Sequence, residues 1–530
     1  MSILVANIGH SDIQIEVGGY YLPLESRMEP NLELPMSGSP ECSIWKSRLD
    51  NLKVAFKDEL DINIDTDLRN HFREISFQLS KQYERWNPYV KIGRIQGLIQ
   101  KALTFDSNLQ AYLVVTNQPK TEKKGYPSDT VHVFDLIESK LKQENPNWFI
   151  GEIPKLSLKK VEITFKAVEE DQLFDYYQTL FHDFGSEETV YVSIKGGTPQ
   201  MQTALKMQAI ASNTKAQIFL SPQPKALKIL AGEPSECFPT AYWRYQQGQT
   251  YRAVHLLLKR WDFDGAATLL TEWYSTLETL IKNGVTDDQH ILKSQQGKVE
   301  RVIRWLELAV AHFNLDKDKV TALAIGDTQL MSLAEQFSKP ENLYAQCKIY
   351  YELRRISHLL SHLGSFFDVS QEDLVERLEG QFDANVKRGS RYRKRGFIKR
   401  LVDRKGMSDN TNISCIIKNW RKLDFWYDIR NQLIHGAKGI NKERLKEVHH
   451  NRLEFLEHMD FQSEDQKRDK KEEYQDACTD EEILPKMRDI LTSLSCIGQT
   501  SDKSNKPWND PRYYGLYGQI QRWAIATLKS

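Results

Sequence analysis

Two different patterns of apolar and polar positions divide the chain. Over roughly the first 235 residues, short apolar runs typical of buried strands alternate with segments of helical periodicity. Such alternation favours a parallel sheet flanked by helices, so we predict a Rossmann-like α/β domain over residues 1–235 with an elaborated first unit before residue 111. The predicted strands are 3–8, 111–116, 161–165, 190–194 and 218–221, and the predicted helices are 44–56, 92–103, 131–141 and 201–211.

The second pattern begins after a break rich in Gly, Pro and Ser at residues 232–239. Strand-like alternation nearly vanishes there, and long apolar stripes with i, i+3, i+4 spacing replace it. We therefore predict an all-α helical domain over residues 240–530. The clearest stripes are 253–261, 266–281, 299–313, 343–363 and 445–455, whereas the charged segment 463–482 and the polar segment 500–511 are expected to be exposed loops.

Composition limits the classes of partner. The chain has 530 residues with 72 Lys plus Arg and 72 Asp plus Glu, so its formal net charge is +0. A balanced charge lacks the general attraction to polyanions that a duplex-DNA binder needs, and we expect only local contacts with nucleic acid and no stable DNA complex. The six cysteines form no C-x-x-C pair, and no long apolar segment is present. We therefore expect a reduced cytoplasmic protein without a membrane segment.

A candidate phosphate site follows the predicted strand 190–194. A lysine and two glycines lead into a helix that Thr198 is placed to cap, with Pro199 in its first position. Glycines allow close approach, and the first backbone N–H groups of a helix attract anions. Ligands of open α/β sheets bind at the carboxyl ends of strands, so the loops after strands 3–8 and 111–116 are expected to border the same pocket. The predicted ligand contacts are Gly9, His10, Ser11, Asn117, Gln118, Lys195, Gly196, Gly197, Thr198, Pro199 and Gln200.

An equally simple interpretation of this segment is a well-capped tight turn. The segment is neither a Walker A motif nor a G-x-G-x-x-G motif. Neither ATP hydrolysis nor dinucleotide binding follows from it.

The helical half contains a candidate ribonuclease motif, in which Arg430, Asn431 and His435 have the spacing R-N-x-x-x-H. RNA can be cleaved without metal when its own 2′-OH attacks the neighbouring phosphate. A histidine can transfer the proton, a guanidinium can stabilise the anionic transition state, and an asparagine can orient either of them. The alternative is that these are ordinary polar groups on a partly exposed helix. Residues five apart do not share one helix face, so we expect two copies of the motif to meet across a two-fold axis.

A basic run lies upstream of that motif. Its predicted RNA-guiding residues are Arg391, Arg393, Lys394 and Arg395. With aromatic neighbours at Tyr392 and Phe397, the run is suitable for single-stranded nucleic acid. More often such a run is a solvated helix face.

The order and spacing of the two motifs resemble the CRISPR-associated CARF-HEPN ribonucleases of type III systems. The resemblance is carried by the sequence from Lys195 to Met201 in the first half and by Arg430-Asn431-x-x-x-His435 in the second. It implies a homodimer that binds a cyclic oligoadenylate in its CARF domain, with tetra-adenylate favoured over hexa-adenylate. It also implies allosteric activation of HEPN domains that cleave single-stranded RNA in antiviral defence, with Arg430, Asn431 and His435 as catalytic residues and no metal or other cofactor.

Some members of that family also degrade the cyclic messenger in the CARF domain, and the sequence leaves this ring-nuclease activity open. Two other interpretations remain. The chain could be a non-catalytic nucleotide-sensing regulator whose helical half binds RNA or a protein partner. It could also be a toxin-like HEPN nuclease with an inert α/β partner.

Overall fold

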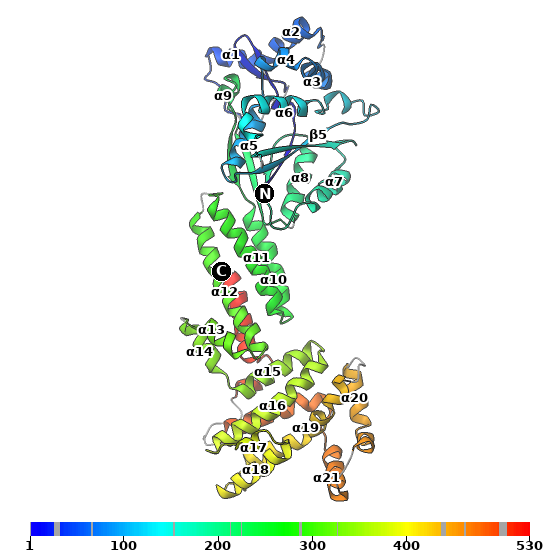
Figure 1. Ribbon diagram of the computed structural model, residues 1–530, viewed down its shortest axis with the longest axis vertical. Coiled ribbons are helices and arrows are strands. Elements are labelled where there is room, and N and C mark those ends of the chain that lie inside the picture. Colours follow the sequence, from blue (N-terminus) through cyan, green and yellow to red (C-terminus); the bar gives the residue numbers. More distant parts are fainter. Residues whose placement is uncertain are drawn as a thin grey trace. The chain divides into compact units, whose positions relative to one another are not determined.

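A computed structural model describes most of the chain and divides it into two compact units (Figure 1). Unit 1 contains Met1–Thr250 and Thr271–Gly297, and unit 2 contains Tyr251–Leu270 and Lys298–Ser530. The helices α10 (Trp243–Lys259), α11 (Phe263–Lys282) and α12 (Gln289–Phe313) contribute residues to both. The described residues are 2–25, 32–64, 67–151, 154–212, 214–223, 225–285, 289–325, 327–435, 441–459, 463–497 and 506–529, without the side chains of 334, 431–435 and 458.

A twisted sheet forms the centre of unit 1. In the described part of the chain its strand order is β6-β5-β1-β7-β8-β9, with all neighbours parallel except the β8–β9 pair. The central strand β1 is buried along its length, as expected when helices cover both faces of a parallel sheet. The strands are β1 (Ser2–Asn7), β5 (Leu109–Thr116), β6 (Leu156–Ile163), β7 (Thr189–Ser193), β8 (Ala216–Gln223) and β9 (Glu236–Thr240).

Helices cover the two faces of this sheet. Ile3 and Val5 of β1 pack with residues of α7 and α8 in one apolar cluster, while α5 and α6 contact β5 from the opposite side (Figure 1). The predicted α/β class is therefore confirmed. The helices wholly within unit 1 are α1 (Pro40–Lys46), α2 (Arg48–Leu60), α3 (Phe72–Lys81), α4 (Tyr83–Trp86), α5 (Gly93–Leu103), α6 (Val133–Glu144), α7 (Glu170–His182), α8 (Pro199–Ala211) and α9 (Ala226–Leu230).

The segment between β1 and β5 is an insert with its own small sheet. Strands β2 (Gln14–Val17), β3 (Tyr20–Pro23) and β4 (Val90–Lys91) pair in the order β3-β2-β4, and α1 to α4 lie between β3 and β4 in the chain. The prediction of one helix over 44–56 is wrong, because the chain breaks at Ser47 into α1 and α2. A single residue with φ −90° and ψ 5° makes that break, and it leaves the apolar spacing on either side intact.

Unit 2 is entirely helical in its described residues, which confirms the predicted all-α half. Its core contains the fully buried rings of Phe366, Phe367, Trp420, Phe425 and Trp426. No helix in the described part of the chain is long and apolar enough to cross a membrane. The helices wholly within unit 2 are α13 (Lys317–Ala324), α14 (Thr328–Gln336), α15 (Lys339–Glu352), α16 (Ile356–Arg377), α17 (Ala384–Lys387), α18 (Arg391–Arg404), α19 (Thr411–His435), α20 (Lys442–His450), α21 (Glu464–Gln475), α22 (Ile483–Ser495) and α23 (Gly515–Lys529).

Several predictions in the helical half are wrong. The stripe 445–455 is not one helix, because α20 ends at His450 and a 3-10 helix over Glu454–His458 follows. The stripe 343–363 is not one helix, because the chain turns between α15 and α16 at Arg354, which has a φ of 57°. The segment 463–482 is not a loop, because α21 occupies most of it and buries Tyr474 completely. Because most residues of this segment are charged, the sequence pattern does not reveal the one helix face that packs inward. Of the predicted loop 500–511, residues 500–505 lie outside the described residues, and Pro507–Asn509 form a short 3-10 helix.

A tight contact between α5 and the segment before β9 makes a first prediction about stability. A Cβ at Gly97 would overlap the carbonyl oxygen of Ser235, which belongs to the backbone and cannot swing away. We expect Gly97→Ala to destabilise the protein by about 1–3 kcal/mol or more, because an overpacked site must shift its surroundings. Gly248→Ala in α10 is the matched control, since a Cβ there meets open space. Equal midpoints for the two variants in urea denaturation would contradict the prediction.

Candidate functional site

The candidate ligand site of unit 1 lies where the parallel strands end. Because β1, β5, β6 and β7 are parallel, the loops that follow them leave the same edge of the sheet. The Thr198 hydroxyl donates to the carbonyl of Ala167 at 2.6 Å, and the Ala167 amide donates to the side-chain oxygen of Gln118 at 3.0 Å. These bonds connect the loops after β7, β6 and β5. The predicted contact residues are thus gathered at one edge.

Arg94, in the first turn of α5, connects the loop after β1 with the loop after β7. Its guanidinium donates to the carbonyls of Asn7 at 2.8 Å and Lys195 at 2.6 Å, and it pairs through two nitrogens with Asp12. The Arg94 and Asp12 side chains are 6% and 0% exposed. The Asp12 carboxylate also accepts from the amide of Gly9 at 2.6 Å. Sequence reasoning missed Arg94, whose only signal is a cation at the start of an apolar helix.

The two glycines after β7 are required by this arrangement. Gly196 and Gly197 have φ values of 98° and 70°, which side chains with a Cβ rarely adopt. A Cβ on Gly196 would also overlap the Asn7 carbonyl and the Arg94 guanidinium. The glycine pair therefore has an internal packing role, independent of any ligand.

The start of α8 matches the prediction for this segment. The Thr198 side chain caps the helix by accepting from the Met201 amide at 3.2 Å, and Pro199 occupies the first helical position. Residues 194–200 are partly or fully exposed. A lysine, a capped helix end and an open backbone therefore lie together, which is the chemistry of an anion site. The assignment of Lys195 to Gln200 as ligand contacts stays a prediction.

Both predicted amides after β5 are engaged within unit 1. Gln118 is 7% exposed, and its amide nitrogen donates to Asp129 at 2.8 Å. Asn117 accepts from Arg73 at 2.9 Å and donates to Glu162 at 2.9 Å. Burial raises the pKa of Asp129, and its hydrogen bonds and Arg73 oppose that rise. Gln118 thus holds the loops in place, while Asn117 joins Arg73 and Glu162 at the same edge of the sheet.

The insert supplies two further groups at this edge. Arg73 of α3 pairs with Asp129 at 2.7 Å and lies 4.1 Å from the ring centroid of Tyr126, a cation that sequence reasoning missed. His10 contacts the carbonyl of Ser128 through Nε2 at 2.8 Å. Burial lowers the pKa of His10, which favours the neutral form of its ring.

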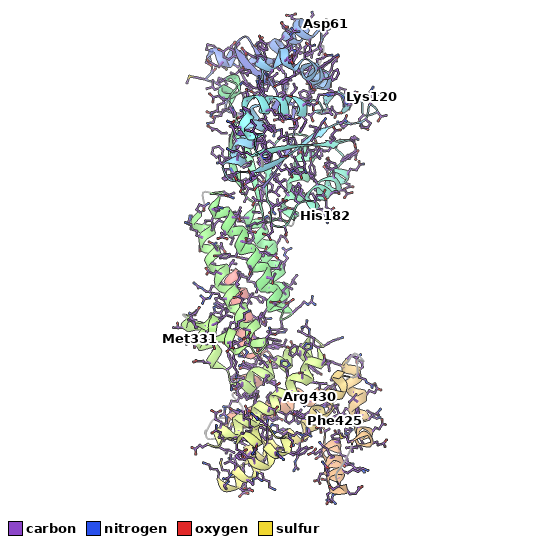
Figure 2. All side chains as sticks on the ribbon, in the orientation of Figure 1. Asp61, Lys120, His182, Met331, Phe425 and Arg430 are labelled. Atoms are coloured by element: carbon purple, nitrogen blue, oxygen red, sulfur yellow. The ribbon has the colours of Figure 1, made fainter. Side chains whose placement is uncertain are left out.

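The candidate ribonuclease motif lies at the end of α19. Figure 2 labels Arg430. The guanidinium of Arg430 lies 3.8 Å from the ring centroid of Tyr427, and its Nη1 donates to the Tyr427 carbonyl at 2.9 Å. Arg430 is partly exposed. Asn431 and His435 continue the same helix, but their side chains lie outside the described residues. The roles of all three stay predictions.

Much of the basic run upstream is buried. Arg391 pairs with Asp428 at 2.6 Å and Arg395 with Asp424 at 2.6 Å, because acids four apart on α19 face α18. Lys394 pairs with Asp368 at 2.7 Å. The alternative interpretation of the run as a solvated helix face is therefore wrong for Arg391 and Lys394, which are buried. Of the four predicted RNA-guiding residues, Arg391, Arg393, Lys394 and Arg395, only Arg393 is fully exposed, and the guiding role stays a prediction.

The charged helix α21 completes this buried cluster. Lys470 contacts both Asp428, at 2.5 Å, and Glu473, at 2.9 Å. Burial raises the pKa of Asp424, whereas Arg395 and Arg391 oppose the rise. The cluster anchors α19 two residues before Arg430, which links α18 and α21 to the position of the candidate motif.

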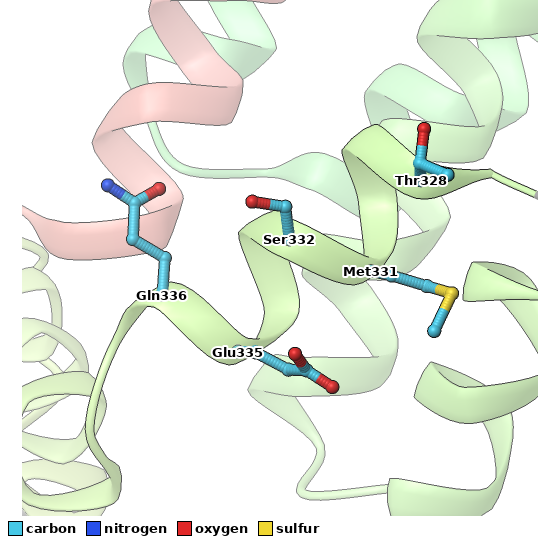
Figure 3. A pocket seen from close by; sticks show the side chains of 5 residues that line it. All are labelled: Thr328, Met331, Ser332, Glu335 and Gln336. Atoms are coloured by element: carbon cyan, nitrogen blue, oxygen red, sulfur yellow. The ribbon is translucent and has the colours of Figure 1, made fainter.

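A hollow on α14 is a weaker candidate. Its volume is about 500 Å³, and its lining consists of exposed side chains of α14 (Figure 3). Its only ionisable lining group is Glu335, so it offers neither an acid–base pair nor a phosphate cradle. Among the described residues, no three His, Cys, Asp or Glu side chains are grouped to hold a metal ion. The lining residues are Thr328, Met331, Ser332, Glu335 and Gln336.

The fold of the chain resembles that of a solved structure. No family model matches the chain, and no curated protein matches it. The chain is similar to the Csm6 protein of Enterococcus italicus bound to cyclic hexa-2′-fluoro-hexa-dAMP. The similarity covers 99% of this chain and 100% of that chain, with a TM-score of 0.47 and 12% sequence identity. A likeness at this level does not by itself assign an activity or a ligand to this chain.

The Arg94–Asp12 pair makes a second prediction. Arg94→Met leaves a buried carboxylate without its cation, so we expect a loss of about 3–5 kcal/mol in the free energy of unfolding. The control is Arg69→Met, because Arg69 pairs with Asp67 where both side chains are about one third exposed, at 35% and 32%. That variant is expected to lose less than about 1 kcal/mol. Similar losses in urea denaturation would contradict a special role for Arg94.

The basic run makes a third prediction. Arg391→Ala removes a buried charge partner and is expected to cost about 3–5 kcal/mol of stability. The triple variant Arg393→Ala, Lys399→Ala and Arg400→Ala changes exposed positions and is expected to keep wild-type stability. If these cations guide RNA, the triple variant binds 2′-O-methylated RNA more weakly, with a salt slope shallower by about one for each lost phosphate contact. An unchanged salt slope would exclude this face from RNA binding.

Proposed function

We propose that this protein is a CARF-HEPN ribonuclease, a metal-independent endoribonuclease that a cyclic oligoadenylate activates to cleave single-stranded RNA in type III CRISPR defence. One observation carries the proposal. A loop edge with a lysine, two glycines and a capped helix start occurs in the same chain as Arg430-Asn431-x-x-x-His435 at the end of a helix. The confirmed order of an α/β half and an all-α half supports it.

In the proposed reaction, His435 accepts the proton of a ribose 2′-OH. The 2′-oxygen then forms a bond to the adjacent phosphorus, and the P–O5′ bond breaks as the leaving 5′-oxygen takes a proton from the imidazolium of His435. Arg430 neutralises the charge that develops on the phosphate oxygens, and Asn431 orients the reacting groups without adding charge. The products are a cyclic phosphate and a free 5′-OH, so no metal or redox partner takes part.

The proposed active form is a homodimer. On an ideal helix, residues five apart differ by about 140° around the axis, so one copy of α19 presents Arg430 and His435 in different directions. Two copies related by a two-fold axis supply both groups to one phosphate. A symmetric cyclic ligand on the same axis contacts Lys195 to Gln200 of both copies and favours the dimer state in which the motifs meet.

The fourth prediction tests this proposal by RNA cleavage in the presence of a chelator. Cyclic tetra-adenylate is expected to stimulate cleavage more than cyclic hexa-adenylate, with little cleavage in the absence of either. His435→Ala is expected to lose at least about 10²-fold in rate while ligand binding persists, because general acid–base catalysis contributes that much. Lys195→Glu is expected to abolish stimulation by repelling the ligand phosphates.

Each other outcome points to a different function. Ligand binding without any cleavage supports the non-catalytic regulator. Cleavage that is independent of ligand supports a toxin-like nuclease. Loss of the intact ring during incubation with His435→Ala adds a ring-nuclease activity in unit 1.

A further inference from the structure

Gly364, in the middle of α16, lies directly against the guanidinium of Arg430. A Cβ placed on Gly364 would lie 3.0 Å from Nε and 3.1 Å from the central carbon of the Arg430 guanidinium. Ordinary contacts of a Cβ are 3.4–4 Å, so a methyl group at this position requires the arginine side chain to move by a few tenths of an ångström. Gly364 is buried, and the space beside its Cα is filled by Arg430.

The opposite restraint on Arg430 comes from its own helix. The Tyr427 ring lies under the guanidinium at 3.8 Å, and the Tyr427 carbonyl accepts the hydrogen bond from Nη1 at 2.9 Å. Tyr427 is itself held by Phe367 of α16, with ring centroids 5.2 Å apart and planes at 71°. A single helix, α16, thus contributes both the backbone surface without a side chain at Gly364 and the Phe367 ring that supports Tyr427.

Within the described part of the chain, this arrangement leaves most donors of the guanidinium without a hydrogen-bond acceptor. An arginine has five N–H donors, and among the described residues only Nη1 of Arg430 donates, to Tyr427. The planar group is therefore held by contacts with its carbon framework, while its other donors can meet phosphate oxygens. Such a side chain is oriented before a substrate arrives, which is what transition-state stabilisation requires.

A glycine at this position is otherwise unfavourable. The φ of Gly364 lies outside the left-handed region, so the backbone does not require glycine. Alanine would be the better residue in a helix interior by about 0.5–1 kcal/mol. We propose that Gly364 is a positioning residue for the reaction, because its missing side chain lets α16 hold the Arg430 guanidinium in place. This inference rests on the proposed function, in which Arg430 contacts the scissile phosphate.

The fifth prediction concerns Gly364→Ala. The added methyl group displaces the guanidinium by a few tenths of an ångström or more, and misplacement of about 1 Å can cost about 10²-fold in rate. We expect kcat for activated cleavage to fall by about 10- to 100-fold, with KM and ligand binding little changed. The melting temperature is expected to stay equal or rise, because alanine favours the helix. The matched control is Gly297→Ala in α12, where a Cβ meets open space and kcat stays at the wild-type value.

A second comparison separates positioning from general damage. Arg430→Lys keeps a cation but lacks the planar guanidinium. Any cleavage that remains in this variant therefore no longer depends on the contact between Gly364 and the guanidinium. Adding Gly364→Ala to Arg430→Lys is expected to cause little further loss, because effects that act through one group are not additive. A full second loss in the double variant, or a lowered melting temperature for Gly364→Ala alone, would overturn the inference.

The two proposals fail in different ways. If Arg430→Ala leaves activated cleavage unchanged, the proposed function is wrong and Gly364 has no reaction to serve. If Arg430→Ala abolishes cleavage while Gly364→Ala has wild-type kcat, the proposed function stands and the positioning role of Gly364 is wrong.

Discussion

The loop edge of unit 1 depends on one buried ion pair between Arg94 and Asp12. A charge that is removed from water is costly unless it is paired and fully hydrogen-bonded, and Arg94 meets that condition through Asp12 and two backbone carbonyls. The same contacts hold the end of β1 against the loop after β7, and they leave no room for a side chain at Gly196. The geometry of the candidate ligand pocket therefore follows from a residue that is itself buried.

Unit 2 uses a similar principle at the candidate ribonuclease motif. Asp424 and Asp428 face inward from α19 and are neutralised by Arg391 and Arg395 of α18 and by Lys470 of α21. These contacts fix the last turns of α19, and α16 holds Arg430 on the other side. In both units, internal charges position the polar groups that sequence reasoning assigned to ligands, so a basic residue near a motif is not automatically a binding residue.

The difference between prediction and structure has a consistent physical cause. Apolar periodicity identified the core strands and most helices, because burial of a strand or a helix face dictates that spacing. It did not register breaks such as Ser47 and Arg354, which change one or two backbone angles without changing the pattern. It also predicted a loop where α21 lies, because one buried tyrosine and one partly buried lysine in a highly charged segment carry little periodic signal.

The sequence by itself determined the two-part architecture, the capped start of α8 and the helical setting of Arg430, since each depends on residues close together in the chain. Only the tertiary structure decided which charged groups are buried. Arg94 and Asp12 are 82 positions apart, and Lys470 and Asp428 are 42 apart. Pairing over such separations depends on how helices and loops pack, and a single sequence carries no local signal of that packing.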